Sequence, residues 1–285
     1  MHPSFMRFPN NRAYHVIYDS SLEDAVKYAS ENNWTSIVPD IGVPAFSPER
    51  ISSEERSQLR DMSRNLSISW GFHAAGDNVS LFSTYPPIRA GIIQYFKQTI
   101  NLAREISTGP TNVVIHAGVP PKFRKSRGQT GNFNELHYET YAQTLREHLT
   151  ELIEHAFPHI KIAIENTGWT PLIRDVVRQL LPKGLKICLD IPKLYGPGFK
   201  LLEEDWNFIQ EHKGFIEVVH IHDIDPKLGS HQVVGEGVVD FERYLRFLSE
   251  LKNKPQYVFE VRPREAANES LTNIGRLLEI LKLDL

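Results

Sequence analysis

Lys161-Ile-Ala-Ile-Glu-Asn-Thr-Gly-Trp169 is the stretch of sequence that decides the fold. Its first half is a short apolar run bounded by turn residues, which predicts a parallel strand buried on both faces. One carboxylate, Glu165, stands where this strand is expected to end. A charge beside such a run is costly to bury unless a cation, a partner charge or hydrogen bonds compensate it. The stretch therefore predicts a buried strand with a functional side chain at its end.

The same arrangement recurs three times downstream. Each apolar run presents a side chain that can bind a metal near its carboxyl end: Lys186-Ile-Cys-Leu-Asp190, Glu217-Val-Val-His-Ile-His-Asp223 and Tyr257-Val-Phe-Glu260. The four side chains, Glu165, Asp190, His220 and Glu260, are separated by 25, 30 and 40 residues. These separations are about the length of one strand-plus-helix unit. This recurrence is the main functional signal in the sequence.

Earlier parts of the chain follow the same alternation. Strands are expected at 13–18, 35–41, 66–73 and 112–116, and the last two of these end on His73 and His116. Apolar spacing and capping residues predict helices between the strands, at 21–33, 52–66, 87–106, 135–156, 171–181, 202–212, 241–251 and 268–281. Eight strand–helix alternations without a shift in composition predict an α/β fold, one (β/α)8 TIM barrel domain over residues 1–285. The polar strand ends would then line one mouth of the barrel.

Bulk properties are those of a soluble globular protein. A chain of 285 residues is long enough for one barrel, and it is 41% hydrophobic and 24% charged. A net charge of −3 gives no global basic field for nucleic acid or an anionic membrane, although local patches leave nucleic acid open. The single cysteine, Cys188, excludes an internal disulfide framework. Since no signal-peptide core or 18-residue apolar span is present, a cytoplasmic protein is expected.

Taken together, the strand ends resemble the xylose-isomerase-like barrel superfamily, which includes sugar isomerases and epimerases and endonuclease IV. The resemblance covers roughly residues 14–280. It rests on the order and the strand-end placement of six motifs: Ile-His-Ala-Gly at 115–118, Ile-Glu-Asn at 164–166, Leu-Asp at 189–190, His-Ile-His-Asp at 220–223, Gly-Glu-Gly at 235–237 and Phe-Glu-Val-Arg at 259–262.

The resemblance implies a metal site. In the isomerases and epimerases, a Glu, an Asp, a His and a Glu from four successive strands hold one divalent metal, and the matching residues here are Glu165, Asp190, His220 and Glu260. Carboxylates and imidazole suit Mn²⁺, Zn²⁺ or Mg²⁺. Scattered strand-end residues that only make loop hydrogen bonds are the plainer alternative.

Endonuclease IV adds further ligands, and the chain matches these only in part. Its second metal uses histidines on earlier strands, which His73 and His116 match, so the resemblance implies one metal and allows two. Its third zinc uses a His three residues after the Asp and an Asp-x-His before the Gly-Glu-Gly. Lys193 and Gly229 occupy two of these places here, and only His231 remains. This departure counts against an endonuclease.

Five residues near the mouth are candidates for contacting a substrate: Lys193, His222, Arg262, Trp169 and His231. His222 shares a strand face with His220, so it points to the mouth if His220 does. Lys193 and Arg262 would favour an anionic substrate, and Trp169 could form an apolar wall against a sugar face. A solvated lysine, a rim ion pair and ordinary packing are the alternatives. The basic loop from Lys122 to Arg127 is either solvated or a lid over the mouth.

Three functions remain open. The leading hypothesis is a metal-dependent isomerase or epimerase of a sugar, sugar acid or sugar phosphate, in which Glu165 and Glu260 transfer protons through an enediolate. The second is a two-metal phosphodiesterase or abasic-site endonuclease, based on His73, His116 and the basic loop. The third is a non-catalytic barrel that binds a metal or metabolite, because fold does not determine function. The expected partner is a small sugar-like molecule, and a homo-oligomer is left open.

Overall fold

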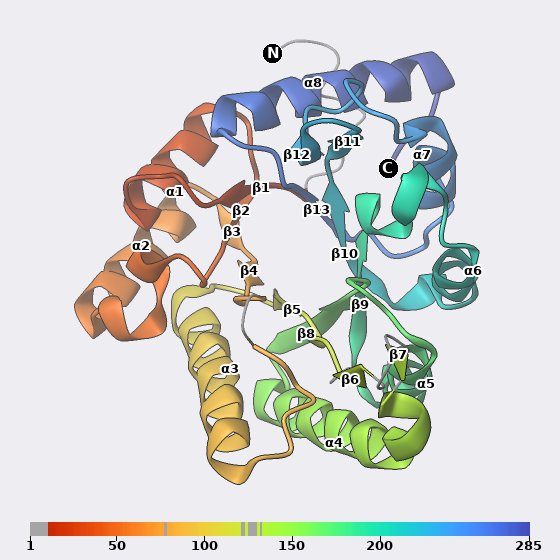
Figure 1. Ribbon diagram of the computed structural model, residues 1–285. Helices are drawn as coiled ribbons and strands as arrows, with labels where there is room; N and C mark the ends of the chain where they lie inside the picture. Colours follow the sequence, from red (N-terminus) through yellow and green to blue (C-terminus); the bar gives the residue numbers. More distant parts are fainter. Residues whose placement is uncertain (1–10, 77–78, 121–122, 125–129, 132) are drawn as a thin grey trace.

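The strands form a ring and the helices surround it (Figure 1). The structure is a computed structural model that describes residues 11–76, 79–120, 123–124, 130–131 and 133–285. Its main sheet is parallel, with the strand order β3-β2-β1-β13-β10-β9-β8-β5-β4. These strands are β1 (Arg12–Val16), β2 (Ser36–Pro39), β3 (Ser69–Trp70), β4 (Phe72–His73), β5 (Thr111–Ile115), β8 (Ile160–Glu165), β9 (Lys186–Asp190), β10 (Ile216–Ile221) and β13 (Gln256–Phe259).

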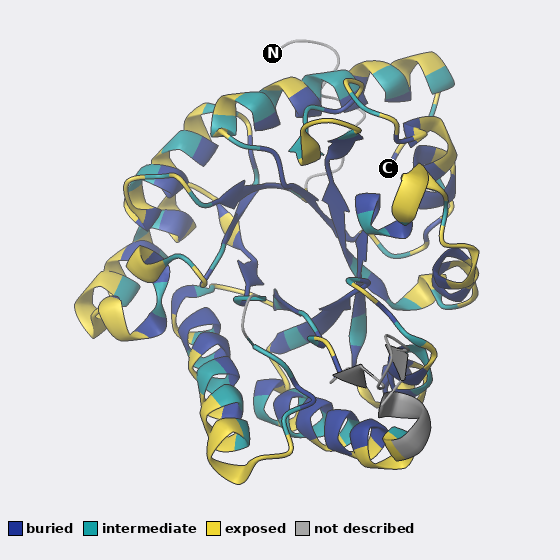
Figure 2. Ribbon diagram, viewed as in Figure 1, coloured by how far each residue is buried: buried dark blue, intermediate teal, exposed yellow. Residues whose placement is uncertain are grey.

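The helices follow the strands in chain order. They are α1 (Leu22–Glu31), α2 (Ser53–Asn65), α3 (Pro86–Ile106), α4 (Phe133–Ala156), α5 (Pro171–Leu180), α6 (Glu203–Glu211), α7 (Phe241–Ser249) and α8 (Arg264–Leu281). Ser21, Ser52, Thr170 and Asp240 cap four of them through their side chains. In Figure 2 the exposed residues lie on the outer faces of the helices and the ring of strands is buried. No helix within the described ranges is long and apolar enough to cross a bilayer.

The third strand of the barrel is split in two, and this split explains the strand order. β3 pairs with β2, and β4 pairs with β5, so the two ends of the order are halves of one strand separated by Gly71. The sheet is therefore closed as an eight-stranded barrel, as the sequence predicts. A side chain at Gly71 would place its Cβ 2.5 Å from Oε1 of Gln256 and 3.0 Å from Cγ2 of Val38, so the Gln256 side chain would have to move to admit it.

Small apolar side chains fill the inside of the barrel. They form a cluster of their own, separate from the larger core between the sheet and the helices. One comes from each strand except the split one, where Gly71 takes the place: Ala13, Val38, Val114, Ala163, Cys188, Val218 and Val258. Cys188 is fully buried in this layer, and burial raises the pKa of its thiol to about 12. This layer closes the barrel beneath the mouth.

Two short hairpins lie outside the barrel and were not expected from the sequence. β6 (Phe123–Arg124) pairs with β7 (Thr130–Gly131), and β11 (Asp223–Asp225) pairs with β12 (Gly229–Gln232), both antiparallel. The sequence predicts loops for these segments, because they are short and rich in polar and turn residues. The second hairpin folds back over the strand β10 and carries His231.

One buried carboxylate fastens the loop that follows the second hairpin. Oδ1 of Asp223 accepts backbone N–H groups of Ile224 (2.8 Å) and Val239 (3.0 Å), and Oδ2 accepts those of Gly235 (2.9 Å) and Gly237 (3.0 Å). A Cβ at Gly237 would lie 2.3 Å from that carboxylate, which explains the Gly-Glu-Gly sequence. The carboxylate is fully buried, so these four bonds replace its hydration.

We expect Asp223→Asn to destabilise the fold by about 3 kcal/mol, because hydrogen bonds to a buried charged group are worth roughly 1.5–3 kcal/mol each and an amide nitrogen cannot accept them. Urea unfolding measures the effect. The matched control is Asp225→Asn, since Asp225 accepts the N–H groups of Lys227 and Leu228 with one oxygen that asparagine retains. Equal unfolding midpoints for the two variants would contradict the anchoring role.

Candidate metal centre

Each of the eight barrel strands turns one polar side chain toward the mouth. Side chains two residues apart on a strand share a face, and each of these polar groups lies two residues beyond the small residue, or Gly71, that fills the barrel on its strand. We call this set the polar ring. In order around the barrel it consists of His15, Asp40, His73, His116, Glu165, Asp190, His220 and Glu260.

His220 lies at the centre of three carboxylates in the polar ring. Its Nδ1 is 3.4 Å from Oε2 of Glu165, 3.4 Å from Oε1 of Glu260 and 3.8 Å from Oδ2 of Asp190. All four side chains are buried, and neither ring nitrogen of His220 has a hydrogen-bond partner among the described residues. Four donor groups thus converge from β8, β9, β10 and β13 without satisfying one another. We call them the central cluster.

The carboxylates of the central cluster are held ionised. Burial opposes the charge of Glu165, but His116, His220 and His73 outweigh it and hold the pKa of this carboxyl well below its usual value. Burial also opposes the charges of Asp190 and Glu260, whose carboxyl pKa values the neighbouring histidines lower in the same way. A buried site with three ionised carboxylates attracts a cation.

Hydrogen bonds from the surrounding chain fix the orientation of the central cluster. Asn166 holds the backbone of Asp190 from both sides: its Oδ1 accepts from the Asp190 N–H (2.7 Å) and its Nδ2 donates to the Asp190 carbonyl (3.0 Å). Oδ1 of Asp190 accepts the backbone N–H of Lys193 (3.0 Å), and Thr167 donates its hydroxyl to Glu165. The Oδ2 atom of Asp190 faces Nδ1 of His220 at 3.8 Å and Nε2 of His222 at 3.4 Å.

The donor set fits a divalent metal. Three carboxylates and one imidazole suit Mn²⁺, Mg²⁺ and Zn²⁺, whose ligand bonds are about 2.0–2.3 Å long. Ligand atoms on one ion therefore lie about 3–4 Å from one another. The distances from Nδ1 of His220 to the three carboxylate oxygens fall in this range, but the four residues do not form one group whose ligand atoms all lie within 4.8 Å of one another. The residues predicted from the sequence as metal ligands thus lie together.

His73 and His116 lie against the outer side of Glu165. Nε2 of His116 is 3.1 Å and Nε2 of His73 is 3.3 Å from the same oxygen, Oε2 of Glu165. The two rings meet edge to face with centroids 5.1 Å apart. A Cβ at Gly76 would lie 2.2 Å from Nδ1 of His116, so this glycine admits the ring. The three side chains could hold a second metal.

His222 and His231 approach the central cluster from the other side. Nε2 of His222 is 3.4 Å from Oδ2 of Asp190, and the rings of His222 and His231 stack at 4.4 Å. Nδ1 of His231 is 2.9 Å from the carbonyl of Glu260. Burial, followed by repulsion from His222, lowers the pKa of His231 to about 4, so its imidazole is neutral at pH 7. Together with Glu260, these histidines form another potential ligand group.

The other predicted substrate residues lie in different surroundings. Arg262 lines a cavity of about 430 Å³ next to His15, and its Nη2 is 3.4 Å from Nδ1 of His15. Lys193 is half-buried, and its contact with Asp190 is made by its backbone N–H. Trp169 is buried: its indole donates to the carbonyl of Glu165 (2.7 Å), and its ring packs on Phe208 of α6. Lys122 and residues 125–127 of the basic loop lie outside the described residues.

Two members of the polar ring, His15 and Asp40, were not predicted as site residues from the sequence. The first two strands were expected to continue to residues 18 and 41, which would have put both side chains inside a strand. In the structure β1 ends at Val16, one residue after His15, and β2 ends at Pro39, one residue before Asp40. The signal that could have found these residues is the two-residue step from Ala13 to His15 and from Val38 to Asp40.

Adding Zn²⁺ or Mn²⁺ to chelated protein should raise the melting temperature by roughly 5 °C. A ligand at a hundred times its dissociation constant stabilises the folded state by about 2.7 kcal/mol. In His220→Asn the shift should be clearly smaller than in the wild type, whereas His212→Asn, a change in a half-buried histidine of the helix layer, should keep the full wild-type shift. An unchanged shift in His220→Asn would show that the metal binds elsewhere.

Comparisons with known proteins identify the fold. A family model described as a xylose isomerase-like TIM barrel matches residues 11–281. A comparison with curated proteins found no match. Among solved structures, a D-tagatose 3-epimerase-like protein is 19% identical with a TM-score of 0.75, over 95% of this chain and 98% of that one.

Two other solved structures represent different members of the fold. The IOLI protein with a bound zinc atom is 16% identical with a TM-score of 0.67, over 95% of this chain and 96% of its own. Endonuclease IV from Thermus thermophilus is 16% identical with a TM-score of 0.69, over 95% of this chain and 99% of its own. At such identities the likeness shows the fold alone. With its family model matched from residue 11 to residue 281, this chain belongs to the xylose isomerase-like TIM barrel family.

Proposed function

We propose that this protein is a divalent-metal-dependent isomerase or epimerase of a sugar or sugar derivative. The observation that carries the proposal is the placement of Glu165 and Glu260. Their carboxylate oxygens both lie 3.4 Å from Nδ1 of His220, but they come from β8 and β13, which β9 and β10 separate in the sheet. The two carboxylates therefore approach the same centre from different sides.

This arrangement suits a proton transfer next to a carbonyl. One carboxylate removes a proton from the substrate carbon, and the other returns a proton to the opposite face or to the neighbouring carbon. A divalent ion held by the central cluster would polarise the substrate oxygens and stabilise the charge that develops on them. The neighbouring histidines lower both carboxyl pKa values, so either carboxylate can act as the base. The residue that returns a proton to the opposite face must first take one up from water.

Arg262 could bind an anionic group of a substrate, although the cavity that it lines also carries Asp19, Asp24 and Glu265 and contains no member of the central cluster. The cavity beside His15 has a volume of about 430 Å³, within the range of small-molecule sites, and Arg262 lines it. The Nε atom of Arg262 is buried and makes no hydrogen bond to the described residues. A carboxylate or phosphate on the sugar would satisfy that donor. Solved structures of the same fold include a D-tagatose 3-epimerase-like protein, which agrees with a sugar substrate.

Glu165→Gln and Glu260→Gln should each reduce turnover of an identified sugar by about 10²–10⁴-fold, because general acid–base catalysis contributes a factor of that size. Exchange of substrate protons with deuterated solvent measures the same step directly. Metal content, determined on each variant, separates loss of the proton-transfer group from loss of the ion. The matched control is Glu217→Gln on β10, which pairs with Lys161 at 2.9 Å. Exchange at the control rate in both variants would rule out the mechanism.

A second candidate function rests on His73 and His116. Both contact the same oxygen of Glu165, a geometry that would allow a second metal to share this carboxylate. Two metals about 3.5–4 Å apart are typical of phosphodiesterases and nucleases. Endonuclease IV shares the fold, although Lys193 and Gly229 replace two residues that its third zinc would need.

An incision assay on duplex DNA with one abasic site tests this second function. An endonuclease would cleave at the abasic site after metal is added back to chelated protein, and His116→Asn would reduce the cleavage. We expect no incision by the wild-type protein, because the chain lacks a net positive charge for DNA. Metal-dependent cleavage lost in His116→Asn would replace the isomerase as the leading function.

A further inference from the structure

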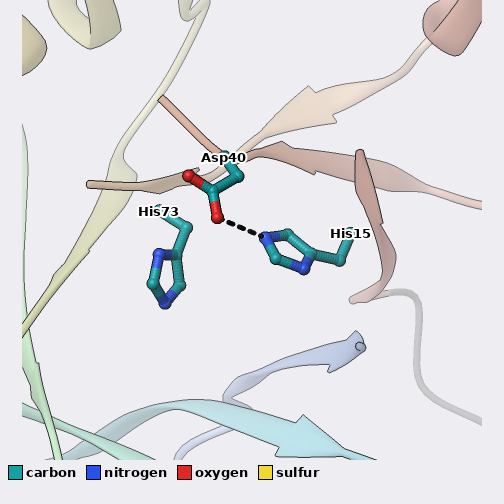
Figure 3. Close-up of side chains that lie close together, drawn as sticks. All are labelled: His15, Asp40 and His73. Carbon is teal, nitrogen blue, oxygen red and sulfur yellow. Dashed lines mark ion pairs between the residues drawn. The ribbon is translucent and has the colours of Figure 1, made fainter. Parts of the chain in front are cut away.

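We propose that His15, Asp40 and His73 form a second divalent-metal site (Figure 3). They are the members of the polar ring on β1, at the end of β2 and on β4, strands that the central cluster does not use. The site is independent of the proposed isomerase activity, since it concerns binding of an ion and shares no residue with the central cluster. We call it the β1–β4 site.

The donor set and spacing of the β1–β4 site suit a transition metal. One ligand atom from each residue lies within 4.8 Å of the others. Two imidazoles and one carboxylate are ligands that zinc, iron and manganese accept, with water completing the coordination. Nε2 of His15 is 3.8 Å from Oδ2 of Asp40, and atoms on one tetrahedral zinc are about 3.4 Å apart, given bonds of about 2.1 Å. A shift of a few tenths of an ångström would complete the pair.

The strongest observation is the buried nitrogen of His15. The residue is 4% exposed, and its Nε2 has no hydrogen-bond partner within the described ranges. The nearest oxygen, Oδ2 of Asp40, is too distant at 3.8 Å for a hydrogen bond. The other oxygen of Asp40 is occupied, because it accepts the backbone N–H of Gly42 at 2.7 Å. An imidazole nitrogen and a free carboxylate oxygen thus face each other across a gap that a cation would fill.

The second nitrogen of His15 fits the same assignment. Its Nδ1 is 3.5 Å from Oε1 of Glu260. A histidine that binds a metal through one nitrogen usually donates its other N–H to a carboxylate, which fixes the ring and its tautomer. The competing arrangement places the proton on Nε2 and lets Arg262 donate to Nδ1 at 3.4 Å. That tautomer would pair His15 and Asp40 without a metal, and a count of bound ions distinguishes the two.

His73 has one nitrogen to offer, and it belongs to three groups of potential ligands. Its Nδ1 is 3.0 Å from the carbonyl of Ala74, so an N–H there leaves Nε2 as the ligand atom. These groups join His73 with His15 and Asp40, with His116 and Glu165, and with His220 and Glu260. The last two groups draw on carboxylates of the central cluster. Glu165 already belongs to the central cluster, whereas Asp40 belongs to no other ligand group among the described residues. Assigning His73 to Asp40 gives each ion its own carboxylate and keeps two cations from sharing one.

Counting zinc per chain tests the proposal. Chelated protein is saturated with Zn²⁺, desalted and measured by elemental analysis. We expect two zinc ions in the wild type and one in Asp40→Asn, which keeps the bond to Gly42 but cannot ligate through its amide nitrogen. Asp225→Asn is the matched control, because Asp225 is also half-buried and also accepts the N–H of the residue two positions later. It should retain two.

Further variants make the outcome decisive. His15→Gln should also lose one zinc, and His116→Asn should lose none. A wild-type count of one, two ions retained in Asp40→Asn, or a loss in His116→Asn instead would overturn the assignment. The wild-type count stands even if a variant fails to fold. Zinc binding is read without a substrate, so failure of the β1–β4 site and failure of the isomerase proposal are separate results.

Discussion

The two-residue alternation of side chains along a β-strand is the constraint on which the whole site depends. Each strand that turns a small residue into the barrel must turn the residue two positions later the same way. The small residues close the interior, as Val258 does beneath Glu260, so the polar groups above them are cut off from water on one side. The apolar interior and the polar ring are thus two consequences of one register.

This register makes the mouth of the barrel electrostatically incomplete. Glu165, Asp190 and Glu260 are buried together around Nδ1 of His220. Neither ring nitrogen of His220 finds a hydrogen bond within the described structure, and Nε2 of His15 is in the same position. Buried groups left in this state are costly. A divalent cation bound there would relieve that cost, and under the proposed function it would also supply charge stabilisation for the proton transfer.

Much of this could be predicted from the sequence, because a charged or imidazole side chain at the end of an apolar run is conspicuous. The barrel, the family and the grouping of Glu165 with His220 follow from such runs. The prediction failed where the apolar run is longer than the strand. Ile17 and Tyr18 extend the apolar pattern beyond β1, so the sequence predicts His15 in the middle of the strand. Contacts between segments that are far apart in the chain leave no pattern in the sequence from which they could be predicted. The anchoring of Gly235 and Gly237 by Asp223 belongs to this kind.

The central claim is that the central cluster holds a divalent metal, and anomalous diffraction from crystals grown with Zn²⁺ or Mn²⁺ tests it most directly. We expect a peak at the metal absorption edge about 2.0–2.3 Å from ligand atoms of Glu165, Asp190, His220 and Glu260. A map with no peak among these four residues at saturating metal would contradict it. In that case the convergence of three carboxylates on His220 would need an explanation other than metal binding.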